Sequence, residues 1–167
     1  MVIRIAIWLV FIIGGITVSL YFDLKYFKSL LFNIPFHLVT FVLGLFVLKL
    51  SFHAAATGGK ALKKYGREGD LPRLETNKLV TSEIYECTRH PMLFGLMFLP
   101  LGIALLLGLP TFIFIISVIE GLLVFLAVVT LEEKEAVMKF GEDYIKYKEK
   151  TPLFPKTKEC FKKLFFD

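Results

Sequence analysis

The chain has few cysteines and lacks the patterns of disulfide-rich or metal-binding proteins. Only Cys87 and Cys160 occur in 167 residues. Two cysteines are too few for a disulfide framework, and they lack the spacing of a zinc site. Cys160 is not part of a CaaX box, so we expect no prenylation there. The sequence therefore predicts no metal site, and the cysteines do not indicate a compartment.

Two other signatures are also missing. The Gly58-Gly59-Lys60 sequence does not have the GxxxxGK[ST] spacing of a phosphate-binding loop. The first apolar stretch is longer than that of a secretory signal and shows no small-residue cleavage site. The formal net charge of +5 could indicate nucleic-acid binding. Because the basic residues cluster beside apolar runs, we expect anionic lipid headgroups as their partners and no nucleic acid.

The dominant feature is apolar sequence. Hydrophobic residues make up 56% of the chain, against about 45 to 50% in an average soluble domain. Four apolar runs are long enough to cross a bilayer, although the third is short and contains Pro100. We therefore predict an all-α fold, a polytopic membrane helix bundle that forms a single domain over residues 1–167. The predicted transmembrane helices are residues 5–22, 30–48, 92–108 and 111–131.

Polar sequence separates and follows these runs. We expect residues 51–90 to form one long polar connection, whose basic cluster at 60–67 faces solvent or headgroups; contact with a phosphate group is the alternative. Residues 133–150 predict one amphipathic helix on the cytoplasmic side, whose apolar face has side chains at steps of three and four, namely Val137, Phe140, Tyr144 and Tyr147. Residues 160–166 mix phenylalanine with lysine, as is typical of a segment in the membrane interface.

The distribution of Lys and Arg predicts the orientation. Residues 49–90 hold eight and the segment from 132 holds nine, whereas 23–28 hold two and 108–110 hold none. By the positive-inside rule, both termini and the long connection are cytoplasmic. Residues 78–90 and the pair Glu132-Glu133 should then emerge on the same side.

Glu120 lies in the middle of the fourth apolar run. An ionised carboxylate at this depth costs several kcal/mol, so we expect Glu120 to face the bundle interior, to be protonated or to have a partner. His37, in the second run, is a possible partner. The alternative is a functional position in a tunnel for a substrate.

Arg89, His90 and Pro91 mark the start of the third run. The ring of Pro91 disfavours helical geometry at His90 and is tolerated in a first helical turn, so Pro91 should begin the helix. The free N–H groups of a helix start favour an anionic ligand group at this point. The residues alone favour simpler roles, in which His90 bonds a backbone carbonyl and Glu132-Glu133 ends a membrane helix.

A longer pattern contains these residues. The sequence LVTSEIYECTRHPMLFG, followed by a hydrophobic hairpin, EE and FGEDYIKYKEKTPLFP, resembles the isoprenylcysteine carboxyl methyltransferase and phospholipid methyltransferase superfamily of integral membrane enzymes. The resemblance covers about residues 76–155. It implies S-adenosylmethionine as the methyl donor and a lipophilic acceptor, similar to a prenylcysteine carboxylate or a lipid headgroup. Val128 stands where the carboxyl methyltransferases carry an arginine, which favours the broader acceptor class.

The resemblance also implies roles for single residues. Glu133 and Arg89 are the catalytic candidates, with Glu133 as a base if the acceptor arrives protonated. The donor should lie in a cytoplasm-facing pocket formed by the core at 76–155, and its partners are a membrane lipid or lipophilic substrate and no metal. The cofactor-binding candidates are Lys78, Leu79, Val80, Tyr85, His90, Pro91 and Glu132.

Two other classes of function are compatible with the sequence. One is a membrane reductase of the sterol-reductase type, for which the polar connection offers little room for NADPH. The other is a non-enzymatic membrane scaffold, in which Glu120 would be the functional residue. Thermal stabilisation by S-adenosylmethionine would favour the methyltransferase, stabilisation by NADPH the reductase, and stabilisation by neither the scaffold.

The predicted orientation can be tested by labelling. Cysteines introduced at Lys25 and Lys64, with both native cysteines replaced, should react with a membrane-impermeant maleimide from opposite sides of the membrane. Labelling of both positions from the same side would contradict the predicted topology.

Overall fold

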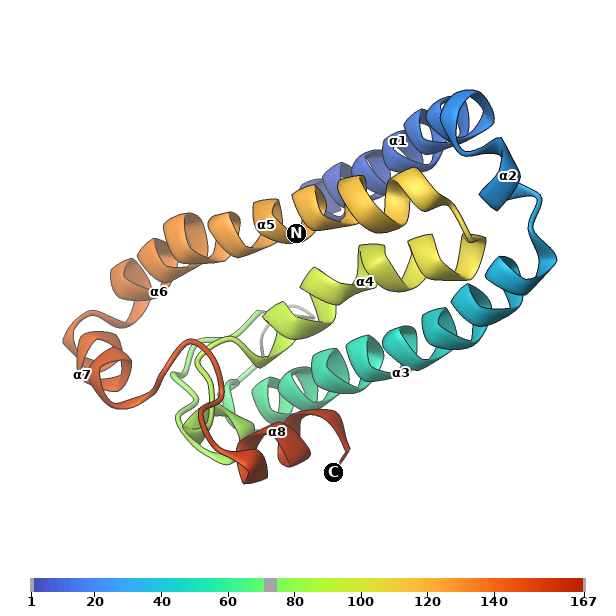
Figure 1. Ribbon diagram of the computed structural model, residues 1–167. Coiled ribbons are helices and arrows are strands. Elements are labelled where there is room, and N and C mark those ends of the chain that lie inside the picture. Colours follow the sequence, from blue (N-terminus) through green and yellow to red (C-terminus); the bar gives the residue numbers. More distant parts are fainter. Residues whose placement is uncertain (1, 71–74, 167) are drawn as a thin grey trace. The chain divides into compact units, whose positions relative to one another are not determined.

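The computed structural model describes residues 2–70 and 75–166 (Figure 1). All regular secondary structure in these ranges is helical, which confirms the predicted all-α class. The chain forms two compact units. Unit 1 consists of Met1–Lys49 and Met97–Val124, and unit 2 of Leu50–Leu96 and Phe125–Asp167. The single domain inferred from the sequence stays a prediction.

Long apolar helices dominate the described part of the chain. Helices α1 (Val2–Tyr26) and α3 (Ile34–Tyr65), together with the continuous helical run Phe112–Phe140, are long and apolar enough to cross a membrane. Helix α4 (Pro91–Leu107) has 17 residues. At 1.5 Å per residue it spans about 26 Å, slightly less than a typical hydrocarbon core. The membrane helix bundle is confirmed, and the count of four spans stays a prediction.

The expected end of the second apolar helix was wrong. Helix α3 continues through Gly58 to Tyr65 instead of ending near residue 50. Ala54 and Ala61 on this extension are buried in the core of unit 2, so tertiary packing holds the polar half of the helix in place. At Gly58 an added Cβ would lie 2.8 Å from the Met92 Cγ atom, so the glycine lets α3 and the start of α4 approach closely.

In unit 1 a buried carboxylate joins α1 to the next long helical run. Asp23 was expected in a polar turn, but it lies inside α1 and is completely buried. Its Oδ1 atom accepts hydrogen bonds from the Thr111 backbone N–H at 2.8 Å and from the Thr111 hydroxyl at 2.5 Å. Thr111 directly precedes the π-helical segment η2 (Phe112–Ile116). Asp23 therefore satisfies donors at a helix start that would otherwise be buried without partners.

The carboxyl-terminal part of unit 2 contains more helices than expected. A π-helical segment, η3 (Val128–Glu132), follows α5 (Ser117–Ala127), which begins in unit 1. The single helix expected over 133–150 was wrong, because Gly141 adopts a φ of 56° and separates two helices. The remaining elements are the short α2 (Lys28–Leu31) in unit 1 and, in unit 2, the 3-10 turn η1 (Glu83–Glu86), α6 (Glu133–Phe140), α7 (Glu142–Lys150) and α8 (Lys158–Phe165).

Helix α8 contains most of the segment expected in the membrane interface. The Thr157 side chain caps it by accepting a hydrogen bond from the Cys160 N–H at 3.2 Å. Leu164 is completely buried in the core of unit 2, next to Phe165, whereas Phe161 and Phe166 are exposed. One side of α8 therefore packs on protein, and only the other side could contact lipid.

Replacement of Asp23 should separate its acceptor role from its charge. Asp23→Ala removes the acceptor of two buried donors, so we expect a loss of about 1 to 3 kcal/mol in the free energy of unfolding. Asp23→Asn keeps an acceptor oxygen of the same shape and should lose clearly less. Thermal and denaturant unfolding of the purified protein in one detergent measures both variants. Equal losses, or none, would show that the contacts with Thr111 do not stabilise unit 1.

Candidate functional site

His90 lies between two carboxylates in unit 2. Its Nε2 atom is 3.0 Å from Oε1 of Glu133, and its Nδ1 atom is 3.6 Å from Oε2 of Glu132. The carboxylates are more than 40 positions away in the sequence. The structure thus brings together the two segments that the sequence analysis expected on one side of the membrane.

The backbone around His90 is fixed from both directions. Pro91 is the first residue of α4, as predicted, and is completely buried. On the other side, the Arg89 N–H donates to the Pro152 carbonyl at 3.1 Å, and the Thr88 hydroxyl donates to the Leu153 carbonyl at 2.5 Å. The segment that follows α7 therefore holds the residues directly before α4, which leaves little freedom for the His90 ring.

Glu133 is the centre of a buried ionic cluster. Its side chain is 6% exposed and forms ion pairs with Arg89 at 2.9 Å and with Lys148 at 2.6 Å. The Tyr144 hydroxyl donates to the same carboxylate at 3.0 Å. Burial and the negative charge of Glu133 raise the pKa of Tyr144 above its usual range, so this phenol stays a hydrogen-bond donor. Both oxygens of Glu133 are thus already engaged by donors from the protein.

The Arg89 side chain also forms several hydrogen bonds within unit 2. Its Nε atom donates to Glu133, and its Nη1 atom donates to the backbone carbonyls of Lys148 at 3.2 Å and Thr151 at 2.7 Å. Its side chain is 11% exposed. Arg89 therefore connects the start of α4 to the carboxyl-terminal end of α7. Arg89 and Glu133 pair with each other beside His90, and their catalytic role stays a prediction.

Glu132 differs from its neighbour in exposure. Its side chain is 42% exposed, and its ion pair with His90 is long, at 3.6 Å. Burial raises the pKa of the Tyr85 phenol above its usual range, and electrostatic interactions with Tyr147 and Glu132 add to this effect. Glu132 thus contacts His90 and acts electrostatically on Tyr85. Of the two adjacent carboxylates, Glu132 is the one with room to accept a hydrogen bond from a ligand.

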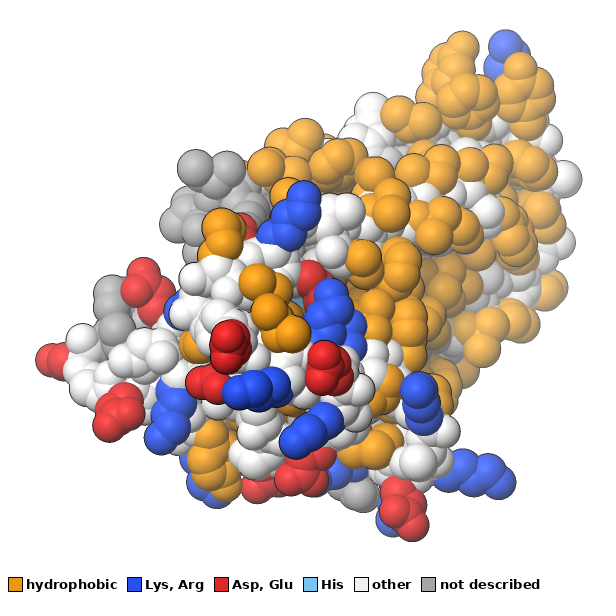
Figure 2. All heavy atoms as spheres, turned by 90° about the vertical axis from the view of Figure 1, so that its left-hand side faces the viewer, with side chains coloured by type: hydrophobic (Ala, Val, Ile, Leu, Met, Phe, Trp, Pro, Cys, Tyr) orange, Lys and Arg blue, Asp and Glu red, His pale blue; other side chains and the backbone are white. Residues whose placement is uncertain are grey.

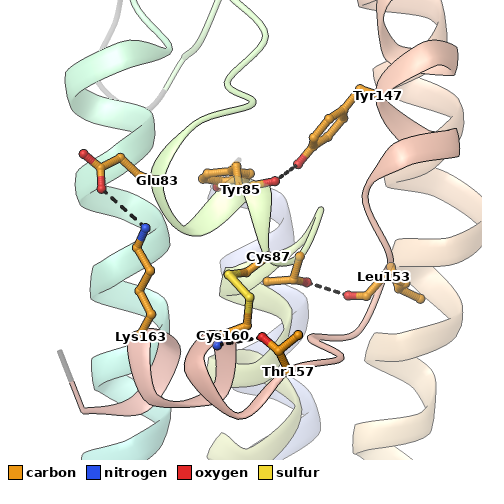
Figure 3. The surroundings of a disulfide bond; sticks show 9 residues. Glu83, Tyr85, Cys87, Tyr147, Leu153, Thr157, Cys160 and Lys163 are labelled. Atoms are coloured by element: carbon orange, nitrogen blue, oxygen red, sulfur yellow. Dashed lines mark hydrogen bonds and ion pairs between the residues drawn. A yellow bond between two sulfur atoms is a disulfide. The ribbon is translucent and has the colours of Figure 1, made fainter.

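The other predicted cofactor-binding residues lie at different depths. Val80 and Tyr85 are buried in the same apolar cluster of unit 2, and the Tyr85 carbonyl accepts a hydrogen bond from the Tyr147 hydroxyl at 2.6 Å (Figure 3). Leu79 is half-buried, and Lys78 is exposed, with its N–H bonded to the Gly66 carbonyl. The predicted set therefore contains a buried part around Tyr85 and an outer part at Lys78.

Three residues of the cluster were missed by the sequence analysis. Tyr144 was assigned to the apolar face of an amphipathic helix, and Lys148 and Thr151 were given no role. Tyr144 and Lys148 are four positions apart and therefore share one face of α7. The four-residue spacing of Tyr144 and Lys148 could have indicated that their polar groups bind one common partner. Nothing in the sequence shows that this partner is Glu133.

A disulfide bond ties α8 to the segment that leads to His90. Cys87 and Cys160 are paired across 73 positions, with their Cα atoms 5.4 Å apart (Figure 3). Lys163 of α8 also pairs with Glu83 at 3.8 Å. Disulfides are rare in the cytosol, so this bond is unusual for the cytoplasmic site that the distribution of Lys and Arg predicts. The labelling experiment on Lys25 and Lys64 tests that orientation.

Charges on the visible face of the protein are mixed. Acidic and basic side chains are interspersed in Figure 2, without a continuous area of one sign. The local pairing of charges at Glu133 is a better guide to the site than the net charge.

The cluster around Glu133 predicts unequal effects of two similar substitutions. Glu133→Gln leaves Arg89 and Lys148 without their common anion, so we expect a loss of about 3 to 5 kcal/mol in the free energy of unfolding. Glu142→Gln is the matched control, because Glu142 is 89% exposed and its pair with Lys146 is 3.9 Å long; it should change stability by less than about 0.5 kcal/mol. Thermal unfolding in detergent compares the two. A similar effect of both would contradict the anchoring role of Glu133.

One comparison with known proteins finds a match. A family model described as phospholipid methyltransferase matches residues 38–143, well over half of the chain. The match includes Arg89, His90 and the two carboxylates. No curated protein and no solved structure matches. The chain thus belongs to the phospholipid methyltransferase family, within the superfamily of integral membrane methyltransferases that its motifs resemble.

Proposed function

We propose that the protein transfers a methyl group from S-adenosylmethionine to the headgroup of a membrane lipid, with the donor bound beside His90 and Glu132. The family supports a membrane methyltransferase that acts on lipid-type substrates. The observation that carries the proposal further is the half-exposed Glu132 carboxylate next to a histidine that is itself fixed by Glu133. A rigid pair with one accessible anion is suited to bind a cationic ligand.

The residues present fit the donor that this family generally uses. S-adenosylmethionine carries a positive sulfonium, an amino-acid end and ribose hydroxyls, and when bound it supplies a methyl group on that sulfur. A carboxylate such as Glu132 accepts hydrogen bonds from ammonium and hydroxyl groups and attracts the cationic sulfur. Val80 and Tyr85 supply buried apolar surface close by. The predicted site residues therefore offer both the charge and the apolar contacts that such a molecule needs.

The contribution of the chain to catalysis is mostly positioning. Methyl transfer from a sulfonium to a neutral acceptor disperses charge, so a dry and ordered site favours it, and no nucleophile on the protein is required. Glu133 and Arg89 would hold the His90 ring and the start of α4 in place. Because both oxygens of Glu133 are bound by cations and a phenol, its contacts support positioning more strongly than the action of a base.

The acceptor is proposed as a lipid headgroup reached from the membrane. Val128, the residue at the position of the arginine of carboxyl methyltransferases, is apolar and buried. A carboxylate acceptor would therefore lack that cationic partner, which favours a headgroup nitrogen or another neutral group. The predicted orientation would place the reaction on the cytoplasmic side.

Titration calorimetry with two ligands tests the donor site. Glu132→Gln should weaken binding of S-adenosylmethionine about 10-fold or more, because a charge-assisted hydrogen bond contributes about 1.5 to 3 kcal/mol. The loss should be smaller for S-adenosylhomocysteine, which has no charge on its sulfur. His90→Ala should also weaken binding of the donor.

Two control variants accompany this experiment. Glu142→Gln removes an exposed carboxylate and Lys60→Ala an exposed lysine of α3, and neither should change the affinity for the donor. Transfer of labelled methyl from the donor into extracted lipid should fall in parallel with affinity. Normal affinity in both site variants would mean that the donor binds elsewhere, and methylation of a soluble acceptor alone would contradict the lipid substrate.

A further inference from the structure

Glu120 of α5 is a buried acid without a matching partner. Its side chain belongs to unit 1, is 3% exposed, and its Oε2 atom has no hydrogen-bond partner. His37, named above as a possible partner, contacts another group: its Nε2 atom lies 2.6 Å from the Leu31 carbonyl oxygen. A carboxyl group in an apolar helix is costly to bury unless something bonds to it. The Glu120 Oε2 atom therefore lacks the hydrogen bond that would offset its burial.

A small cavity lies beside this carboxyl group. It has a volume of about 230 Å³. Among the wall residues Val10 is 69% exposed and Ile119 is 51% exposed, so the cavity opens on the apolar surface of unit 1. Apart from Glu120, the residues that line it are glycines and apolar side chains, namely Val10, Phe11, Gly14, Gly15, Val18, Ile116, Ile119 and Leu123.

Two adjacent glycines shape the cavity in different ways. At Gly15 an added Cβ would lie 2.9 Å from the Glu120 Oε1 atom, so this glycine allows the carboxyl group to reach α1. At Gly14 an added Cβ would meet nothing within 4 Å, so the backbone of α1 leaves open space there. Gly15 therefore provides the space for the Glu120 carboxyl group, and Gly14 leaves the cavity beside it unfilled.

We propose that this cavity binds the amine group of a lipophilic amine whose hydrocarbon chain extends along the apolar surface. A carboxylate accepts a charge-assisted hydrogen bond from an ammonium group, and a neutral carboxylic acid donates one to a neutral amine. An amine can therefore form a hydrogen bond with Glu120 whether the proton is on the amine or on the carboxyl group. The apolar wall and the outward opening suit a chain that continues into the bilayer.

The size of the cavity limits the ligand. Its volume is below the usual range of about 300 to 1,000 Å³ for pockets that enclose a whole ligand. It therefore holds a primary amine and the first part of a chain, and not a bulky headgroup. This inference does not depend on the proposed methyl transfer, because every residue involved lies in unit 1 and the test measures binding.

Photolabelling tests the site directly. The probe is a dodecylamine with a diazirine in its chain, added to the purified protein in nanodiscs of uncharged lipid, and mass spectrometry locates the labelled peptides. Label should concentrate on the peptides around Val10 to Val18 and Ile116 to Leu123. Unlabelled dodecylamine should compete, whereas dodecyltrimethylammonium, which keeps the charge but has no N–H group, should not.

Two variants change different parts of the cavity. Glu120→Gln keeps the shape but removes the acid, and it should lower specific labelling about 10-fold. Gly14→Leu fills the open space without altering the acid, and it should lower labelling to a similar degree. Because Gly14 lies in open space and leucine favours helix, this variant should fold normally.

Several results would overturn the proposal. Labelling that is equal in the parent protein and both variants would show that the probe binds the apolar surface without using Glu120. Competition by dodecyltrimethylammonium as strong as that by dodecylamine would exclude the hydrogen bond. Loss of a dimer in Glu120→Gln, together with labelling that is unaffected by unlabelled amine, would show that a second copy of the chain covers this face instead.

Discussion

The ion pair between Glu133 and Arg89 is the interaction on which the rest of unit 2 depends. It joins the end of a long membrane helix to the segment that begins α4, and Lys148 adds α7 to the same anion. The side chains of Glu133 and Arg89 are nearly buried, so each of these two charges needs the other to offset its loss of hydration, whereas Lys148 is half-exposed. Removing Glu133 or Arg89 leaves the other charge buried without its closest partner. The cluster therefore ties three distant segments into one arrangement around His90.

The adjacent residues Glu132 and Glu133 have different surroundings, which suit one to a structural role and the other to ligand binding. Glu133 faces inward and is surrounded by donors, whereas Glu132 is 42% exposed and contacts His90 over a longer distance. Glu132 is the last residue of the π-helical segment η3 and Glu133 is the first residue of α6, so the rotation per residue changes between them. Consecutive residues point in different directions from a helix, so one can anchor the fold while the next meets a ligand. A pair of acids at this point supports both requirements.

The sequence predicted what local patterns and charge determine. Apolar length predicted the membrane helices, and Pro91 correctly marked the start of α4. The ends of elements were less predictable, because they depend on contacts with distant residues. Helix α3 continues past Gly58 because α4 packs against it, and Asp23 is buried in α1 because Thr111 meets it. The helix break at Gly141 could have been suspected from glycine itself, which adopts a positive φ with little strain.

Prediction of the candidate site had the same limit. His90 and the two glutamates could be expected together, because charge distribution and the family pattern placed their segments on one side. The sequence could not predict the contacts made by Tyr144, Lys148 and Thr151, because it does not show which face of α7 turns toward Glu133. The pairing of Cys87 with Cys160 was equally hidden, because they are 73 positions apart and two cysteines form no recognisable pattern.

Glu120 and Glu133 show two solutions to the same physical problem in one helical run. Both are carboxyl groups with little access to water, and each needs a donor or a cation. Glu133 lies where the apolar sequence has ended, so basic and phenolic side chains from polar segments can reach it. Glu120 lies in the middle of an apolar sequence, where the nearby wall of unit 1 consists of glycines and hydrocarbon side chains. No lysine or arginine in the described part of unit 1 forms an ion pair with it, so an amine that arrives from the bilayer would supply the missing partner.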